Sequence, residues 1–200
     1  MKKNLFKSAF AMAIALMTIP CFGQNSKATV LPIVETSDEA TLQGISNNGK
    51  WAVGYAFDNS GETAFSIAAS KWNLETGERT ILTEAEDGMS EANCINDEGT
   101  VIGGAYLFQP AFHKDGIWHT LEIPEGYVGG TVSNMTIVNG DTICVGNVYS
   151  ADGNTYAAAK WVNKKYERAN PNTIRRDRLG EAANVNTCFD ISEDGNTILG

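Results

Sequence analysis

One ten-residue pattern recurs along this chain, and it constrains the fold more than any other feature of the sequence. The pattern starts with isoleucine, continues with Ser or Asn and two polar residues, and carries glycine at its fifth and tenth positions. Its copies are ISNNGKWAVG (45–54), INDEGTVIGG (95–104), ISEDGNTILG (191–200) and a weaker IVNGDTICVG (137–146). The closing glycines are spaced by 50, 42 and 54 residues. Such a period indicates a protein built from repeated structural units.

Each copy predicts a β-hairpin. An apolar strand ends at the isoleucine, the polar residues and the first glycine form a turn that needs a positive φ angle, and an alternating strand follows. The second glycine closes this strand. The glycines that we predict to have a structural role, in the turn or in packing, are Gly49, Gly54, Gly99, Gly104, Gly146, Gly195 and Gly200.

The rest of each period repeats as well. After each hairpin, small or aromatic residues lead to a tryptophan, at Trp72, Trp118 and Trp161. We interpret these tryptophans as equivalent positions and predict that they pack between neighbouring units. A short turn and a last apolar strand follow, as in RTIL (79–82). Four short strands in about 50 residues, without helical periodicity, predict an all-β protein and specifically a β-propeller made of four-stranded blades.

The same residues resemble the bacterial extracellular repeats called HAF repeats. The resemblance is carried by Ser46, Gly49, Gly54, Ala64, Phe65 and Trp72, and in the second copy by Asn96, Gly99, Gly104, Ala111, Phe112 and Trp118. The histidine that precedes Ala-Phe in that family is replaced here by Thr63 and Pro110. The resemblance implies an exported, propeller-like protein and implies no particular activity.

The first 23 residues are typical of a secretory signal peptide. Lys2, Lys3 and Lys7 precede a short apolar stretch, and small residues stand before a predicted cleavage site after Gly23. The stretch is short for a membrane anchor, so we expect no membrane span. Export to the periplasm, the outer surface or the medium is expected.

Residues 24–200 are expected to form one incomplete propeller of about three and a half blades. The strand predicted at 28–34 stands before the first full copy, as in propellers that close with an N-terminal strand. The last copy stops inside its hairpin, which suggests an N-terminal fragment. The repeats are predicted at about 40–82, 91–123, 131–169 and 184–200.

The charge and the cysteine content of the chain limit the partners, metals and cofactors that we expect. The formal net charge is −9, and removal of the three leader lysines makes it −12. Nucleic acid is therefore not an expected partner, because it needs a positive surface. Cys94, Cys144 and Cys188 show no metal-binding spacing, so we interpret them as buried, with one disulfide possible after export. No cofactor is predicted; Ca²⁺ is conceivable for acidic loops, although no EF-hand spacing is present.

Long loops are expected on the face opposite the tight hairpin turns, and ligands usually bind there. Carboxylates of these loops could hold a cation, and the arginines could grip a carboxylate or a sulfated sugar. The alternative is that these charges are simply solvated. SADGNTY (150–156) also resembles an Asp-box, which stabilises a turn. The candidate ligand-binding residues are Asp58, Glu84, Glu86, Asp87, Asp152, Arg175, Arg176 and Arg178.

No catalytic motif is recognised, and we assign no catalytic or metal-binding residue. The favoured hypothesis is an exported, non-catalytic propeller that binds a glycan or an envelope protein through its long-loop face. The alternative is a propeller enzyme, a glycan hydrolase or lyase, whose catalytic residues would lie partly beyond residue 200.

Overall fold

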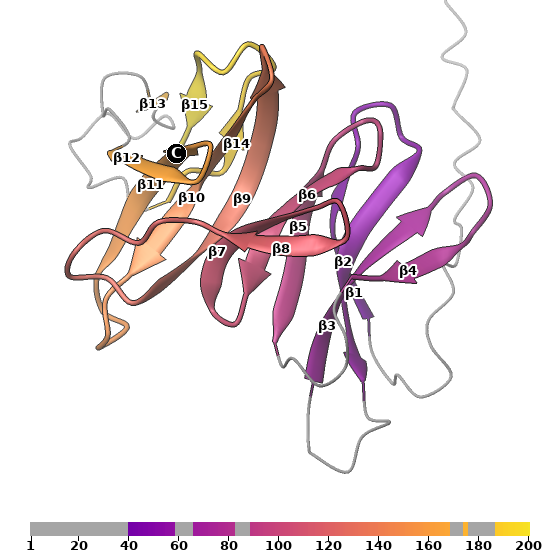
Figure 1. Ribbon diagram of the computed structural model, residues 1–200, viewed down its shortest axis with the longest axis horizontal. Coiled ribbons are helices and arrows are strands. Elements are labelled where there is room, and N and C mark those ends of the chain that lie inside the picture. The colour runs from indigo at the N-terminus through magenta and orange to yellow at the C-terminus, as the bar shows by residue number, and fades with distance from the viewer. Residues whose placement is uncertain (1–39, 59–65, 83–88, 169–173, 176–186) are drawn as a thin grey trace, which may run out of the picture. The chain divides into compact units, whose positions relative to one another are not determined.

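The structure, a computed structural model, describes residues 40–58, 66–82, 89–168, 174–175 and 187–200. The described residues form strands and turns and contain no helix, and therefore none long and apolar enough to cross a membrane. The predicted all-β class is confirmed. The predicted strand at 28–34 lies outside the described residues. Figure 1 shows the sheets following one another in chain order, from indigo to yellow.

Three sheets contain four antiparallel strands each, ordered as in the chain. This arrangement confirms the predicted four-stranded units. The strands are β1 (Ala40–Ile45), β2 (Trp51–Asp58), β3 (Ser66–Asn73) and β4 (Arg79–Ile81); β5 (Ser90–Ile95), β6 (Val101–Tyr106), β7 (Gln109–Lys114) and β8 (Ile117–Thr120); β9 (Gly129–Val138), β10 (Asp141–Tyr149), β11 (Tyr156–Val162) and β12 (Lys165–Arg168).

The C-terminal sheet differs from the other three. Its hairpin is formed by β14 (Asp190–Ile191) and β15 (Ile198–Leu199). A short strand that precedes this hairpin, β13 (Ile174–Arg175), pairs with β15 in parallel. It lies along the edge of β15 where the other sheets carry their antiparallel third strand. The sequence analysis predicted no strand here, between the repeats at about 131–169 and 184–200.

The closing glycine of the repeat faces a bulge in the first strand of its sheet. In the second sheet, Gly104 pairs with Ala92 and Gly103 pairs with Cys94, so Asn93 is the extra residue. The bulge brings the carbonyl oxygen of Glu91 to the place that a side chain at Gly104 would occupy. Gly54 and Gly146 face a backbone carbonyl oxygen in the same way, of Thr41 and Thr131.

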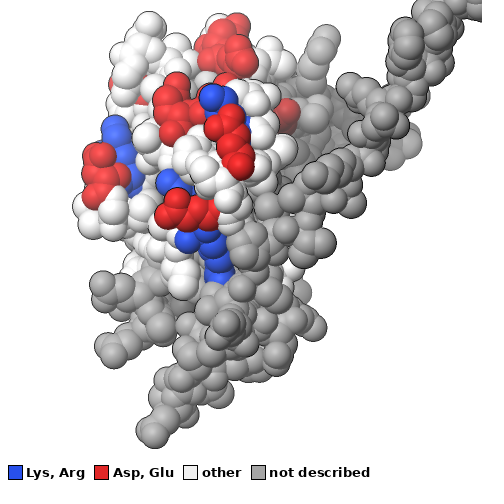
Figure 2. Space-filling model, turned by 90° about the vertical axis from the view of Figure 1, so that its right-hand side faces the viewer, with Lys and Arg blue, Asp and Glu red and all other residues white. Residues whose placement is uncertain are grey.

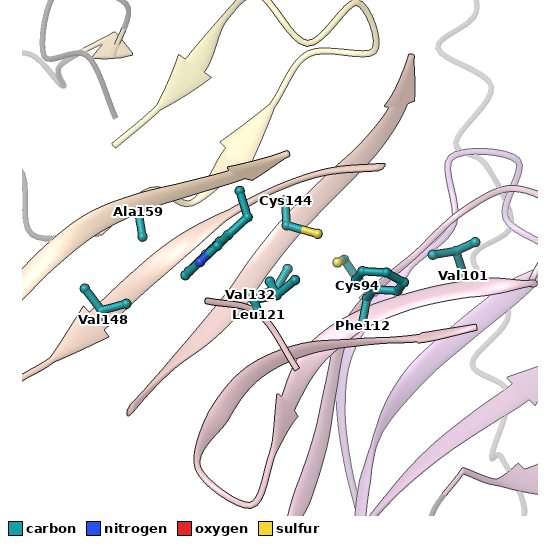
Figure 3. Packing of buried hydrophobic residues seen from close by; sticks show 9 residues of the cluster. Cys94, Val101, Phe112, Leu121, Val132, Cys144, Val148 and Ala159 are labelled. Carbon is teal, nitrogen blue, oxygen red and sulfur yellow. The ribbon is translucent and has the colours of Figure 1, made fainter. Parts of the chain in front are cut away.

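The hydrophobic core lies between successive sheets rather than inside one of them. Figure 3 shows the cluster that joins the second and third sheets. Here Phe112 and Cys94 meet Val132, Cys144 and Trp161, and the thiols of the two cysteines are directed toward one another. Both cysteines and Cys188 are buried and free. Comparable clusters join the first sheet to the second, and the third to the C-terminal sheet.

The prediction that three tryptophans occupy equivalent positions is wrong for Trp118. Trp72 and Trp161 lie on the third strand of their sheets and are buried. Trp118 lies on β8, the fourth strand, because a tight turn at Asp115-Gly116 ends β7 before the tryptophan is reached. The residue at the equivalent register is His113, which pairs with both Ile102 and Trp118.

Trp118 nevertheless supplies the same contact as Trp161. The indole N–H of Trp118 donates to the carbonyl oxygen of Leu82 at 3.2 Å, and that of Trp161 donates to the carbonyl oxygen of Glu122 at 2.8 Å. Both acceptors lie just after the fourth strand of the preceding sheet. An indole therefore holds the chain as it leaves one sheet for the next.

Candidate functional site

The ligand-binding residues predicted from sequence are not brought together among the described residues. Glu84, Glu86, Asp87, Arg176 and Arg178 lie outside the described residues. Asp58 ends β2 and Arg175 ends β13, and the structure describes only their backbone. Asp152 is described fully.

Asp152 stabilises a tight turn between β10 and β11. Its carboxylate accepts bonds from the Ser150 hydroxyl at 2.5 Å and from the Asn154 backbone N–H at 3.0 Å. These bonds lower the pKa of Asp152, the Ser150 hydroxyl having the largest effect. The turn that starts at Ser192 is built identically, with Asp194 in the place of Asp152. The segment that holds the candidate Asp152 is thus a turn of the same class as the hairpin turn at Ser192.

At the same end of the second and third sheets as the Asp152 turn lies a cavity of about 280 Å³, which we call the loop-end pocket. It is lined by the ends of β6 and β10, by the starts of β5, β9 and β11, and by the turn between β6 and β7. Three aromatic rings and one carboxyl group are its most distinctive features. Its lining residues are Met89, Glu91, Ala105, Phe108, Gly130, Thr131, Asn147, Tyr149 and Tyr156.

Phe108 reaches this pocket from a strained turn between β6 and β7. Leu107 and Phe108 have φ angles of 50° and 65°, and their side chains are 47% and 58% exposed. Two-residue hairpin turns of this class require two positive φ angles and favour Asn-Gly or Asp-Gly. The protein uses those pairs elsewhere, at Asn139-Gly140 and Asp115-Gly116. Two bulky apolar residues in such a turn are therefore exceptional.

The backbone of this turn is fixed by two bonds. The Tyr149 hydroxyl donates to the carbonyl oxygen of Phe108 at 3.1 Å, and the Gly130 N–H donates to the same oxygen at 3.0 Å. Tyr149 lies against Gly129, where any side chain would overlap the phenol ring and its hydroxyl. The ring of Tyr156 lies 6.1 Å from that of Tyr149, at an interplanar angle of 49°. The glycine therefore admits the ring that anchors the turn.

Glu91 is the acidic group of the loop-end pocket. Partial burial raises the pKa of its carboxyl group above 4.5. Burial also raises the pKa of the Tyr149 phenol, with smaller contributions from Tyr156 and from Glu91. None of the ion pairs found among the described residues involves Glu91. A carboxyl group in this setting suits a ligand that supplies positive charge or a hydrogen-bond donor.

A second, larger cavity of about 1000 Å³ runs along the first strands of the sheets. Two of its amide side chains bond neighbouring sheets. Asn93 donates to the Thr131 hydroxyl and to the Val132 carbonyl oxygen, both at 2.9 Å, and Asn134 donates to the Asp190 carboxylate. These groups connect sheets. Across the described part of the chain, no three His, Cys, Asp or Glu side chains lie close enough to hold a metal ion.

The charged surface is mixed on the face seen in Figure 2. Acidic and basic side chains lie interspersed there, and the described residues form no continuous basic patch on that face. The sequence analysis named charged loop residues as ligand candidates and missed the aromatic ones. The signal that could have identified them is the pair Leu107-Phe108, which stands at a hairpin turn where Asn-Gly is usual.

Comparison with known protein families and with curated protein sequences gives no match. Among solved structures, the chain is similar to a protein from Agrobacterium tumefaciens provisionally described as TolB, at 14% sequence identity and a TM-score of 0.45. The similarity covers 64% of this chain and 48% of that structure, so this chain corresponds to about half the length of the protein it matches.

Proposed function

We propose that this chain is an exported, non-catalytic β-propeller interaction module whose four-stranded sheets are the blades. Its ligand binds in the loop-end pocket, on the face where the sequence predicts the binding loops. The cores between successive sheets and the repeated period of about 50 residues support the propeller. The sequence of residues 1–23, which is typical of a signal peptide, supports export. A glycan and an envelope protein remain the ligand classes that the sequence suggests.

The strained turn at Leu107-Phe108 carries this proposal. A left-handed conformation costs about 1–2 kcal/mol for a residue other than glycine. The turn bears that cost twice in order to present two exposed apolar side chains, one of which lines the pocket. Strain of this kind is concentrated at binding and catalytic sites.

The number of carboxyl groups in the described lining of the pocket favours binding over glycoside hydrolysis. Glycosidases of the common type act with two carboxyl groups on either side of the scissile bond. Glu91 is the one carboxyl group among the described residues that line the pocket.

The test combines a ligand screen with a variant that relieves the strain. Labelled full-length protein is applied to a glycan array, and a fragment library is screened by saturation-transfer NMR. The double variant L107N/F108G places the preferred residues in the turn, so it should fold with a gain of about 1–2 kcal/mol in stability and lose ligand binding. The control is K164G, because Lys164 also has a positive φ angle, 77°, in the β11–β12 turn at the other end of its sheet.

Ligands whose binding is lost in L107N/F108G and retained in K164G support the proposal. A protein that binds nothing in either screen, or that binds equally well with and without Phe108, would overturn it.

A further inference from the structure

Few polar side chains of the loop-end pocket are available to bond a ligand. The Tyr149 hydroxyl is used by the carbonyl oxygen of Phe108, and the Thr131 hydroxyl already accepts a bond from Asn93. Glu91, Asn147 and Tyr156 are the remaining polar side chains of the described lining for which no hydrogen bond is found. A sugar ring requires several donors and acceptors around it, since each buried hydroxyl without a partner costs free energy.

The charge of the pocket is uncompensated among the residues that the structure describes. Its lining contains one carboxyl group, at Glu91, and no Lys, Arg or His. A ligand cation would supply the missing counter-charge. It would also reverse the unfavourable effect of burial on the ionised carboxylate, because a nearby opposite charge favours the charged form.

The rings complete a site for a cation. Phe108, Tyr149 and Tyr156 come from three different segments and line one cavity. The hydroxyl of Tyr149 is held by the turn, so its ring is fixed in place. Aromatic rings attract ammonium groups through their π faces, and quaternary ammonium ions are recognised by cages of such rings. The volume of about 280 Å³ is at the small end for ligand pockets, which suits a compact head group rather than an extended chain.

We propose that the loop-end pocket binds an alkylated ammonium group, with the rings of Phe108, Tyr149 and Tyr156 around the cation and the Glu91 carboxylate as its counter-ion. This inference rests on the proposed function, since it assigns a ligand class to the same pocket. The cation binds the ionised carboxylate. Its affinity is therefore full above the raised pKa of Glu91 and falls as the pH drops through that pKa.

The experiment uses two probes of nearly equal shape, choline and its uncharged carbon analogue 3,3-dimethyl-1-butanol. Binding of each probe to the full chain is followed by the NMR shifts of the protein's tyrosine and phenylalanine resonances. We expect choline to bind at least about tenfold more tightly than the neutral analogue, the ratio that ring and carboxylate attraction to a cation produces. The variant E91Q should reduce this ratio to the smaller preference that the rings alone produce, and K164G should leave it unchanged.

Equal binding of the two probes, or a preference for choline that is unchanged in E91Q, would overturn the assignment. A neutral glycan from the array whose binding needs Phe108 would also overturn it and would leave the proposed function standing. If neither probe binds and no other ligand is sensitive to L107N/F108G, both proposals fail.

Discussion

The glycine that closes the repeated pattern can be tested by the substitution Gly104→Ala. A methyl carbon at this position would stand 1.8 Å from the carbonyl oxygen of Glu91 on the paired strand. Side-chain carbons of this kind essentially never lie closer than 3.0 Å, so β5 and β6 would have to separate by about 1.2 Å. Gly104 does not have a positive φ angle, so the cost is steric and comes from the bulge alone.

The magnitude follows from the bonds that such a separation breaks. A ladder hydrogen bond contributes about 1 kcal/mol, and a buried group left without a partner costs about 1–3 kcal/mol. We expect G104A to lower the free energy of unfolding by about 3–5 kcal/mol. For a chain of this size the melting temperature should fall by about 10 °C. Urea denaturation followed by tryptophan fluorescence and far-ultraviolet circular dichroism measures both the loss and its cooperativity.

Gly77→Ala is the matched control for this substitution. Gly77 has a φ angle of 75° and no atom within 4 Å of the added methyl group, so its cost is conformational only, about 1–2 kcal/mol. If G104A were no more destabilised than G77A, the argument that the bulge demands glycine would be refuted.

Three further substitutions or measurements test the packing and the turns. Trp161→Phe removes the indole bond to Glu122 and leaves a buried gap, so the free energy of unfolding should fall by about 2–4 kcal/mol; a loss well below 1 kcal/mol would show that the bond is dispensable. Burial raises the pKa of the Cys94 thiol to about 12, so a thiol reagent at neutral pH should label it only after unfolding, and rapid labelling of the native protein would contradict its burial. The lowered pKa of Asp152 means that its carboxylate stabilises the fold above the ordinary value of 3.8 and that this contribution is lost as the pH falls through the lowered value. The difference in unfolding free energy between wild type and D152A should therefore shrink in acid, and a difference that is independent of pH would count against the turn bonds.

The hairpins were predictable from sequence because their determinants are local. A turn position with a positive φ angle, such as Gly49 with φ 70°, can be recognised from the residue types of the turn itself. The four-stranded order follows, since short antiparallel strands joined by tight turns pair with their neighbours. The position of Trp118 was misassigned because the tryptophan was used to align the repeats. The pair Asp115-Gly116 was the better guide to the end of the strand.

The candidate site was less predictable because it depends on contacts between sheets. Glu91 and Tyr149 are far apart in the sequence, and only the stacking of the second and third sheets brings them to one cavity. The need for glycine at position 129 cannot be predicted from the neighbouring sequence either, because it arises from the ring of Tyr149 and not from a turn. Charged residues attracted the prediction because charge is read directly from a sequence, whereas the strain at Leu107-Phe108 is recognised only once the hairpin turn has been placed there.

Because of the indole bonds from Trp118 and Trp161, the stability of one sheet depends on the sheet that follows it in the chain. Each bond is donated by a later sheet to the segment that leaves the earlier one. The segment that follows the fourth strand of a sheet therefore gains this hydrogen bond only when the next sheet is folded. In a repeat protein whose stability is a sum of unit and neighbour terms, damage to one indole should propagate backward along the chain. Hydrogen exchange at β4 should consequently report on Trp118, although the two belong to different sheets.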